Sequence, residues 1–461
     1  MDDFVCISPV DGREVARRPP TPAAEVARAL ERARRAQRAW REVPPAARCA
    51  PVRRFLEAME RLNAGIVPEL AWQMGRPVRY GGELRSLTER VEAMIALAPE
   101  ALADEVRERG RVARVPAGLV LVIAPWNYPF LTAANTIVPA LLAGNAVILK
   151  HSAQTLLAGE RFAEAFASAD LPEGLFQNLF LTHDETARLL GAGAVDHATF
   201  TGSVEGGRAI ERAAAGSFTT LTLELGGKDP AYVRADADLA GAVAGLVDGS
   251  FYNSGQSCCG VERIYVHEAA WQPFLDGFVE AALAWRLGDP LDPETSLGPM
   301  ASAKGAARVR RQVEAAVKAG ARTHLPRQLF PGDTGEGAYL MPQVLTGVDH
   351  GMAVMREETF GPAVGIMKVK DDAEAVRLMN DSAYGLTASI WTRDLDAAAH
   401  LAGAVEAGTV LANRCDYLDP ALAWTGVKDS GRGASLGRYG FDSVTRPKSL
   451  HLPKSLPPRS V

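Results

Sequence analysis

The strongest constraint on the fold of this chain is a regular alternation of short apolar runs and amphipathic segments, which begins at residue 119. The apolar runs cover 119–124, 146–150, 176–181, 198–200 and 221–225, and segments with helical spacing lie between them at 131–142, 156–169, 185–190 and 205–215. Strands that alternate with helices in this way predict parallel βαβ units with right-handed crossovers. Wholly apolar strands fit a sheet covered on both faces. We therefore predict an α/β fold with a doubly wound, parallel-sheet nucleotide-binding domain.

The flanking sequence predicts further structure on both sides of this domain. The first hundred residues are mainly helical by pattern, most clearly over 22–40 and 48–63. A second α/β series extends from about 229 to 428, and its clearest elements lie at 261–267, 271–287, 364–370 and 388–391. The charged, alternating segment 105–114 favours a solvent-exposed hairpin strand. A chain of 461 residues with this organisation is expected to form two or three domains.

Composition limits the classes of partner. The formal net charge is −5 and no basic stripe interleaved with aromatic residues occurs, so no nucleic-acid partner is expected. The longest apolar stretch, 131–150, is interrupted by Asn135, Pro139, Gly144 and Asn145, whereas a membrane span needs roughly 20 mostly apolar residues. Five cysteines do not form a disulfide framework, and the acidic N-terminus is not a secretory signal. We expect free thiols, no membrane association and a cytoplasmic location.

A pair of adjacent cysteines, Cys258 and Cys259, lies between Gly255 and Gly260, just before a predicted strand. A thiol in such a loop is placed for exposure and activation. A cysteine among small residues is, however, more often buried and inert, and two adjacent cysteines cannot close a metal site. We expect no bound metal.

Polar residues at two predicted strand ends favour a reactive cysteine over a buried, inert one. Open α/β sheets bind ligands at the carboxyl ends of their strands. Asn127 follows the first parallel strand, where its side chain can donate to an oxyanion or form an Asx-type turn. Glu224 lies in an apolar context at the end of the strand 221–225, as a tunable general base requires. A third segment, Glu357–Pro362, has the sequence E-E-T-F-G-P.

The chain resembles the aldehyde dehydrogenase superfamily over essentially its whole length. The elements P-W-N-Y-P, F-T-G-S, E-L-G-G-K, G-Q-x-C, E-x-F-G-P and K-D-S-G-R-G occur in the family's order, and the last is similar to semialdehyde dehydrogenases. The resemblance implies a cofactor domain (1–104 and 119–226), a catalytic domain (227–428), and a small bridging β hairpin. Residues 105–118 and 440–461 would then join subunits into a homodimer or homotetramer.

The resemblance also implies a reaction and its residues. An aldehyde would be oxidised to a carboxylate with NAD or NADP, through a thiohemiacetal and a thioester on Cys258. Asn127 and the Cys258 backbone N–H would form the oxyanion hole, and Glu224 would activate the deacylating water. The residues implied for the cofactor are Trp126, Lys150, Ala153, Gly202, Ser203, Glu358 and Phe360, and those for the substrate tunnel are Tyr128, Asn135, Leu418 and Trp424.

The preference between NAD and NADP and the identity of the aldehyde both remain open. NAD-preferring relatives often carry Glu where this chain has Ala153. Because no carboxylate here repels the 2′-phosphate of NADP, we expect the enzyme to use NADP. His151 and Ser152 are candidate contacts for that phosphate. Alternatively, Ala153 only packs and Lys150 suffices for NAD. The tunnel residues suggest an apolar wall, but Arg414, Asp416 and Asp419 in the same loop also permit a charged aldehyde.

Two alternative functions remain. A CoA-acylating dehydrogenase would not need Glu224, and an inactive binding protein would be expected to lack the thiol, the base or Asn127. The glycine-rich stretch Gly431–Gly437 looks like a dinucleotide fingerprint but has one residue too many and no preceding strand. The family resemblance implies that it is a structural segment, so we expect no phosphate-binding role for it.

Overall fold

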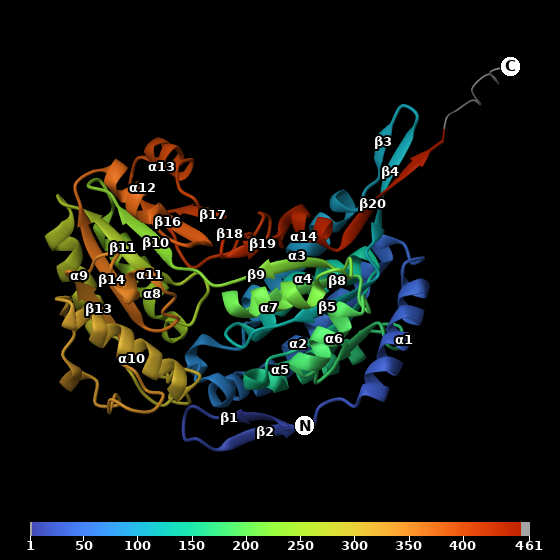
Figure 1. Cartoon of the computed structure of the whole chain (residues 1–461), viewed down its shortest axis with the longest axis horizontal. Coiled ribbons are helices and arrows are strands. Elements are labelled where there is room, and N and C mark those ends of the chain that lie inside the picture. Colours follow the sequence, from blue (N-terminus) through green and yellow to red (C-terminus); the bar gives the residue numbers. More distant parts are fainter. Residues whose placement is uncertain (1, 453–461) are drawn as a thin grey trace.

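The computed structural model describes residues 2–452 and contains two sheets built mainly of parallel strands, each covered by helices (Figure 1). The first sheet has the order β19-β9-β8-β5-β6-β7, in which only β19 is antiparallel. Its strands are β5 (Leu119–Ile123), β6 (Ala146–Lys150), β7 (Phe176–Asn178), β8 (His197–Thr201), β9 (Thr220–Glu224) and β19 (Gly431–Arg432). The parallel sheet predicted from the alternation is confirmed.

The helices between these strands also lie where the pattern predicts them. They are α4 (Pro129–Ala143), α5 (Leu156–Ala167), α6 (His183–Gly191) and α7 (Val204–Ala214). Helix α4 has Pro at its first position and ends at Gly144, whose φ of 96° suits only glycine without strain. Three N-terminal helices pack around this domain: α1 (Ala23–Trp40), α2 (Pro45–Met74) and α3 (Leu84–Ala101).

The second sheet has the order β12-β13-β14-β11-β10-β16-β17, and all its neighbours except β12 and β13 are parallel. Its strands are β10 (Asp229–Val233), β11 (Val261–His267), β12 (Arg322–Thr323), β13 (Gln343–Thr346), β14 (Ala363–Val369), β16 (Thr387–Trp391) and β17 (Thr409–Ala412). The helices are α8 (Leu239–Phe251), α9 (Trp271–Leu283), α10 (Ala303–Lys318), α11 (Ala353–Arg356), α12 (Asp372–Asn380) and α13 (Leu395–Ala402). Helix α9 ends four residues before the predicted 287, because Leu287 pairs in extended conformation with Leu297.

A third, antiparallel sheet forms an arm that projects from the body, at the upper right of Figure 1. It consists of β3 (Glu105–Arg107), β4 (Gly110–Pro116) and β20 (Thr445–His451), in the order β20-β4-β3. The hairpin predicted at 105–114 is therefore present. Strand β20 of the same chain pairs with β4, from Thr445 opposite Pro116 to His451 opposite Gly110. The predicted segment 440–461 extends beyond the described residues.

The sequence prediction missed a hairpin at the start of the chain. Strands β1 (Phe4–Ile7) and β2 (Glu14–Arg18) pair antiparallel around an Asp-Gly turn, in which Gly12 has φ 79°. The second predicted helix, 48–63, is the longer α2, which contains Pro51 and Pro68. Shorter elements are β15 (Tyr384–Gly385), β18 (Val427–Lys428), α14 (Gly437–Ser443) and the 3₁₀ turns at Val78–Tyr80, Ala153–Thr155, Tyr252–Gly255 and Arg327–Leu329. Within residues 2–452, the helices are all too short or too polar to cross a membrane.

Candidate active site

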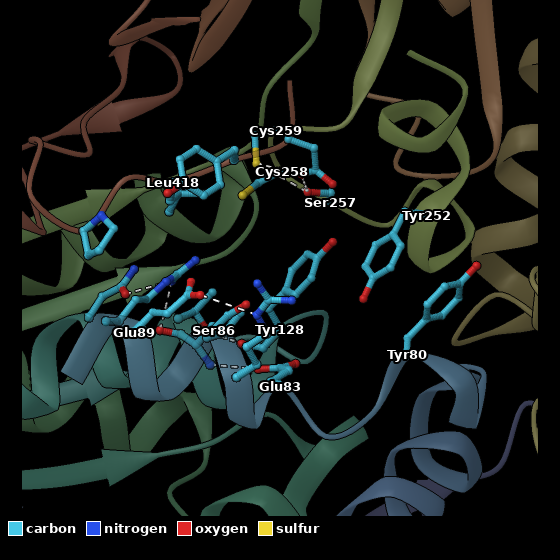
Figure 2. Close-up of a pocket in the computed structure, with 18 of the residues that line it drawn as sticks. Tyr80, Glu83, Ser86, Glu89, Tyr128, Tyr252, Ser257, Cys258, Cys259 and Leu418 are labelled. Atoms are coloured by element: carbon cyan, nitrogen blue, oxygen red, sulfur yellow. Dashed lines mark hydrogen bonds and ion pairs between the residues drawn. The ribbon is translucent and has the colours of Figure 1, made fainter. Parts of the chain in front are cut away.

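A cavity of about 600 Å³ is lined by α3, α4, the end of β9, and the loops at 252–259 and 416–424. Figure 2 shows Ser257, Cys258 and Cys259 on one side of it and Glu83, Ser86 and Glu89 on the other. The predicted residues that line it are Glu224, Cys258, Tyr128, Asn135, Leu418 and Trp424. Asn127 and the residues expected to contact the cofactor lie outside this lining. The cavity therefore joins the proposed nucleophile, base and tunnel residues, but not the cofactor set.

The loop before Cys258 has an unusual backbone. Asn253, Ser254 and Gly255 have successive φ values of 52°, 57° and 65° in the left-handed region, which strains non-glycine residues by about 1–3 kcal/mol each. A side chain at Gly255 would place its Cβ 2.3 Å from the carbonyl oxygen of Gly361, so only glycine fits. Ser254 Oγ donates to the Gly298 carbonyl at 2.8 Å and fixes the loop from the other side. The conformation is thus determined by its surroundings.

The two adjacent thiols have different environments. Cys258 is half-buried and lines the cavity, and its backbone N–H donates to no group within residues 2–452. Cys259 is 2% exposed, and its Sγ donates to Asp416 Oδ1 at 3.0 Å. A hydrogen bond with Cys258, burial and the charge of Asp416 raise the pKa of Cys259 well above its usual range. Both thiols line the cavity, but Cys259 is the more deeply buried of the two and remains a protonated thiol.

Asn127 lies directly behind this loop. It is 4% exposed, and its Nδ2 donates to the Gln256 carbonyl at 3.1 Å. A side-chain amide has two N–H donors, so one remains for another acceptor. Gln256 holds the loop in turn, because its Oε1 accepts from the Ala301 backbone N–H at 2.8 Å. Gln256 belongs to the G-Q-x-C element, but the sequence analysis did not predict that it positions the loop before Cys258.

A buried ion pair fixes the segment that carries Asn127. Arg76 Nη1 and Glu83 Oε1 are 2.5 Å apart, and both side chains are at most 3% exposed. Arg76 Nη2 donates to the Asn127 carbonyl at 2.6 Å, and Glu83 Oε2 accepts from the backbone N–H groups of Phe130 and Leu131. A carboxylate at the start of α4 satisfies donors that have no partner inside the helix. No local motif indicated this pair.

Glu224 ends β9 and is 7% exposed. Burial raises the pKa of its carboxyl, whereas hydrogen bonds from Ser435 and Thr201 and the charge of Arg90 lower it. Ser435 Oγ donates to Oε1, and Thr201 Oγ1 donates to Oε2 at 3.3 Å. Ser435 belongs to the stretch Gly431–Gly437, which the sequence prediction treated as structural only. The structure shows that this stretch also supplies a hydrogen bond to Glu224.

The two glycines after Glu224 permit close contacts with other site segments. A Cβ at Gly226 would lie 2.4 Å from Glu358 Oε2, and one at Gly227 would lie 2.4 Å from the Cys258 carbonyl oxygen. The E-L-G-G-K element therefore brings Glu224, the thiol loop and Glu358 together.

The side chains expected at the cofactor lie at the carboxyl ends of the first sheet and on the loop after α11. Lys150 ends β6 and is 9% exposed, burial lowers its pKa, and its ammonium donates to no group within residues 2–452. Ser203 caps α7, its Oγ accepting from the Gly206 backbone N–H at 3.2 Å. A Cβ at Gly202 would lie 2.6 Å from the Phe200 ring, so glycine keeps the backbone close to it.

Glu358 and Phe360 lie opposite this sheet edge. Glu358 Oε1 accepts from the Gly227 backbone N–H at 3.2 Å, while burial and the charge of Glu262 raise the pKa of Glu358 to about 7. The Phe360 ring meets the Trp126 ring edge-on, with 5.5 Å between centroids. Glu358 thus contacts the segment that follows β9, and Phe360 contacts the residue that precedes Asn127.

A match to known proteins decides the family. The sequence profile of the aldehyde dehydrogenase family matches residues 2–450. The chain belongs to the aldehyde dehydrogenase family. Accordingly it is an oxidoreductase that converts an aldehyde to a carboxylic acid with a nicotinamide cofactor, through the covalent thioester mechanism general to the family.

Individual relatives of this dehydrogenase carry different substrate names. The chain is 37% identical to 4,4′-diapolycopene aldehyde oxidase of Methylomonas sp, covering 97% of this chain and 86% of the relative. It is 33% identical to succinate semialdehyde dehydrogenase [NAD(P)+] Sad of Escherichia coli (strain K12), covering 95% of each chain. The solved structure of succinic semialdehyde dehydrogenase from Streptococcus pyogenes in complex with NADP+ superimposes with a TM-score of 0.92 at 27% identity, covering 98% and 100%. Overall similarity thus does not select one substrate.

The residues expected to hold NAD(P) fit that cofactor. The Lys150 ammonium, which has no partner within residues 2–452, could donate to ribose hydroxyls, and the N-terminus of α7 could offer backbone N–H groups to a pyrophosphate. His151 is not available to a phosphate, which corrects the sequence expectation: its Nε2 contacts the Pro129 carbonyl at 3.1 Å and its Nδ1 accepts from the Ser152 backbone N–H at 2.9 Å. Burial also lowers the pKa of His151 to about 4, so the ring is neutral.

The dehydrogenase's metal-binding potential is limited. Over the described residues 2–452, His, Cys, Asp and Glu side chains do not gather into any group of three placed to hold a metal ion.

Proposed function

We propose that Cys258 is the nucleophile of this dehydrogenase, that Asn127 and the Cys258 backbone N–H bind the oxyanion, and that Glu224 is the general base. The observation that supports this most directly is that Glu224 and both thiols line the same cavity, in which Cys258 is the more exposed thiol because Cys259 is buried against Asp416. The free N–H of Cys258 and the second N–H of Asn127 are the two donors that an oxyanion next to the sulfur requires.

The proposed reaction has two halves, formation of a thioester on Cys258 and its hydrolysis. The Cys258 thiolate adds to the aldehyde carbon, and the carbonyl oxygen becomes an oxyanion held by Asn127 and the Cys258 N–H. NAD(P), held by Lys150, Ser203 and Glu358, would supply the acceptor for the hydride that leaves this carbon. As the oxyanion collapses to a carbonyl, the C–S bond is retained as a thioester. Glu224 then takes a proton from water, whose oxygen bonds to the acyl carbon as the C–S bond breaks. The carboxylic acid leaves and the thiolate is regenerated.

Glu224 favours hydrolysis over transfer of the acyl group to CoA. Ser435 and Thr201 orient its carboxylate, which a CoA-acylating enzyme would not need. The presence of thiol, base and amide together also argues against an inactive binding protein.

We expect the enzyme to use both cofactors, with NADP turnover within about tenfold of NAD, because one missing acidic contact is worth about 1–2 kcal/mol. Ala153 opens the short turn after β6 and is partly exposed, so no carboxylate at this position repels a 2′-phosphate. Ser152 caps the same turn, with its Oγ accepting from the Gln154 backbone N–H at 3.3 Å.

We further propose a cytoplasmic homodimer or homotetramer joined through the arm of β3, β4 and β20. Thiols are kept reduced in the cytosol, and all five thiols are unpaired within the described residues. Edge strands in an arm of this kind are usually covered in a native assembly.

Substitution of each of the two cysteines by alanine tests whether Cys258 is the nucleophile. Cys258→Ala is expected to lower turnover by at least about 10⁴-fold, since removing a covalent nucleophile leaves only binding and polarisation. The reaction is followed by absorbance of the reduced nicotinamide. Cys259→Ala is the matched control and is expected to keep most activity and to remain sensitive to thiol reagents. Turnover retained by Cys258→Ala, or lost equally in both variants, would reject Cys258 as nucleophile.

A further inference from the structure

Arg90 is a buried cation in the wall of the active-site cavity. It lies on α3, lines the cavity, and is 8% exposed. Its Nη1 donates to Asn135 Oδ1 at 2.9 Å and more weakly to the Leu131 carbonyl at 3.4 Å. Within residues 2–452, its Nε and Nη2 donate to no acceptor and no carboxylate forms an ion pair with it. A buried cation that no carboxylate contacts directly is costly, so a partner from outside the chain is expected.

Asn135 adds a second unused donor at the same place. It is 1% exposed, and its Oδ1 is occupied by Arg90, which fixes the orientation of the amide. Its Nδ2 consequently points away from Arg90, and it is buried without a hydrogen-bond partner in the described residues. Arg90 and Asn135 thus offer donors and no free acceptor. A ligand that only accepts hydrogen bonds, such as a carboxylate, matches this pair.

The acidic groups nearby do not serve as the missing partner. Glu83 is paired with Arg76, and Glu89 lies 3.5 Å from Arg85. Glu224 accepts from Ser435 and Thr201. The remaining acid close to Arg90, Asp416, accepts from Ser257 and Cys259 through its Oδ1.

The position of Arg90 sets the size of the ligand. Burial lowers the pKa of Arg90, and the charges of Glu83, Cys259, Glu224 and Cys258 oppose this shift, so the guanidinium lies within electrostatic reach of the reacting sulfur. Figure 2 shows the α3 wall, marked by Ser86 and Glu89, across the cavity from Cys258. Both Arg90 and Cys258 line the same cavity of about 600 Å³, so one small molecule inside it can touch both groups.

We propose that Arg90 and Asn135 bind a carboxylate at the far end of the substrate, so that the preferred substrates are short aldehydes with a terminal carboxylate. This inference rests on the proposed function, because the aldehyde carbon must lie at Cys258. The planar guanidinium donates two parallel hydrogen bonds to one carboxylate, and Asn135 Nδ2 supplies a third.

The test measures kcat/KM for two probes of equal length, succinate semialdehyde and its neutral methyl ester. The wild-type enzyme is expected to prefer the charged probe. Arg90→Met is expected to lower the ratio of charged to neutral kcat/KM by about 10²–10³-fold, mainly through KM, because a charge-assisted bidentate contact is lost. Arg90→Lys, which keeps the charge but not the planar fork, is expected to recover part of the ratio. Asn135→Leu is expected to lower it by about tenfold.

A matched control and a binding measurement separate this proposal from other roles of Arg90. Arg85→Met removes the same charge from an exposed position of α3, and the ratio is expected to change less than about threefold because exposed charges are screened. Succinate should raise the melting temperature of the wild type but not that of Arg90→Met.

The outcomes distinguish this proposal from the proposed function. A wild-type preference for the ester, or an equal loss on both probes in Arg90→Met, would overturn the carboxylate site while leaving the aldehyde chemistry intact. Failure of the proposed function would instead appear as turnover that persists in Cys258→Ala with either probe. If Arg90→Met does not fold, the wild-type preference and Arg90→Lys still decide the question.

Discussion

At the scale of single residues, the burial of Glu224 conflicts with its proposed role as a general base. A general base has to be ionised, yet burial raises the pKa of this carboxyl. Ser435 and Thr201 oppose this by donating to the carboxylate, which stabilises the charged form. The pKa therefore depends on two hydroxyl groups that come from different parts of the chain.

Removing Ser435 should shift the pH dependence of deacylation. Ser435→Ala deletes a contact that lowers the pKa of Glu224, so the pKa rises and the carboxylate forms only at higher pH. The acidic limb of kcat is expected to move upward by about one pH unit, since one unit equals about 1.4 kcal/mol and a hydrogen bond to a charge is worth a similar amount. Thr201→Val should give a smaller shift, because its hydrogen bond is longer at 3.3 Å.

Glu224→Gln provides the limiting case for this pH profile. Turnover should fall by about 10²–10⁴-fold with the acidic limb abolished, while a burst of reduced nicotinamide persists because hydride transfer precedes deacylation. An unshifted limb in Ser435→Ala, or a normal deacylation rate in Glu224→Gln, would show that another group activates water.

Residues in local motifs were predictable, and residues that act through distant partners were not. Cys258, Glu224 and Asn127 each stand in a short signature at a strand end or loop. Ser435 is 211 positions from Glu224, and Arg90 meets Asn135 across 45 positions. In the sequence Arg90 looks like one more cation on an amphipathic helix, because nothing local shows that its face turns inward. Only the packing of α3 on α4 reveals it.

At the scale of elements, three segments are joined by one buried ionic network behind the cofactor residues. Lys228 follows β9, Glu262 lies in β11, and Thr359 lies in the loop after α11. Lys228 Nζ contacts Glu262 Oε2 at 2.5 Å and Thr359 Oγ1 at 2.8 Å. Glu262 also accepts from the backbone N–H groups of Thr359 and Phe360 at 2.8 Å. The network therefore sets the position of the loop that carries Glu358 and Phe360.

Breaking this network should affect stability and cofactor binding together. Lys228→Met leaves the Glu262 carboxylate buried without its cation, which typically costs about 3–5 kcal/mol. We expect a lower melting temperature and a KM for NAD(P) that rises more than the KM for the aldehyde. The double variant with Glu262→Gln should recover part of the stability, because no unpaired charge remains. A double variant less stable than Lys228→Met would contradict this explanation.

Element prediction succeeded where side-chain periodicity was long and failed where the signal was short. Strand β6 and strand β11 occur at the predicted residues, because continuous apolar runs bounded by turns mark them. The hairpin of β1 and β2 was missed, since each strand has five residues or fewer and only the Asp-Gly turn at Gly12 signals it. The pairing of β20 with β4 joins residues 445–451 to residues 110–116 and leaves no local trace in either segment.

At the scale of the whole molecule, the arm is the feature that a single chain leaves incomplete. Strand β3 pairs only with β4 within residues 2–452, and β20 has one free edge. Val106 on β3 is 74% exposed, which is unusual for an apolar side chain on an edge strand. The arm projects from the body in Figure 1, so contacts with its own chain do not cover these edges.

The last prediction follows from these exposed edges. Light scattering at micromolar concentration is expected to give a mass of two or four times the chain mass of 49.1 kDa. A chain that ends at Arg446 loses most of β20 and exposes β4, so the mass and the melting temperature should both fall. A chain that ends at Leu452 keeps β20 and should retain both.

Val106→Lys separates association from folding, since an exposed lysine leaves the arm intact but places a charge where a second subunit would pack. It should lower the mass while changing the melting temperature less than the truncation does. A wild-type mass near 49 kDa, or an unchanged mass in both the truncated chain and Val106→Lys, would show that the arm stays exposed in a monomer or that subunits meet elsewhere.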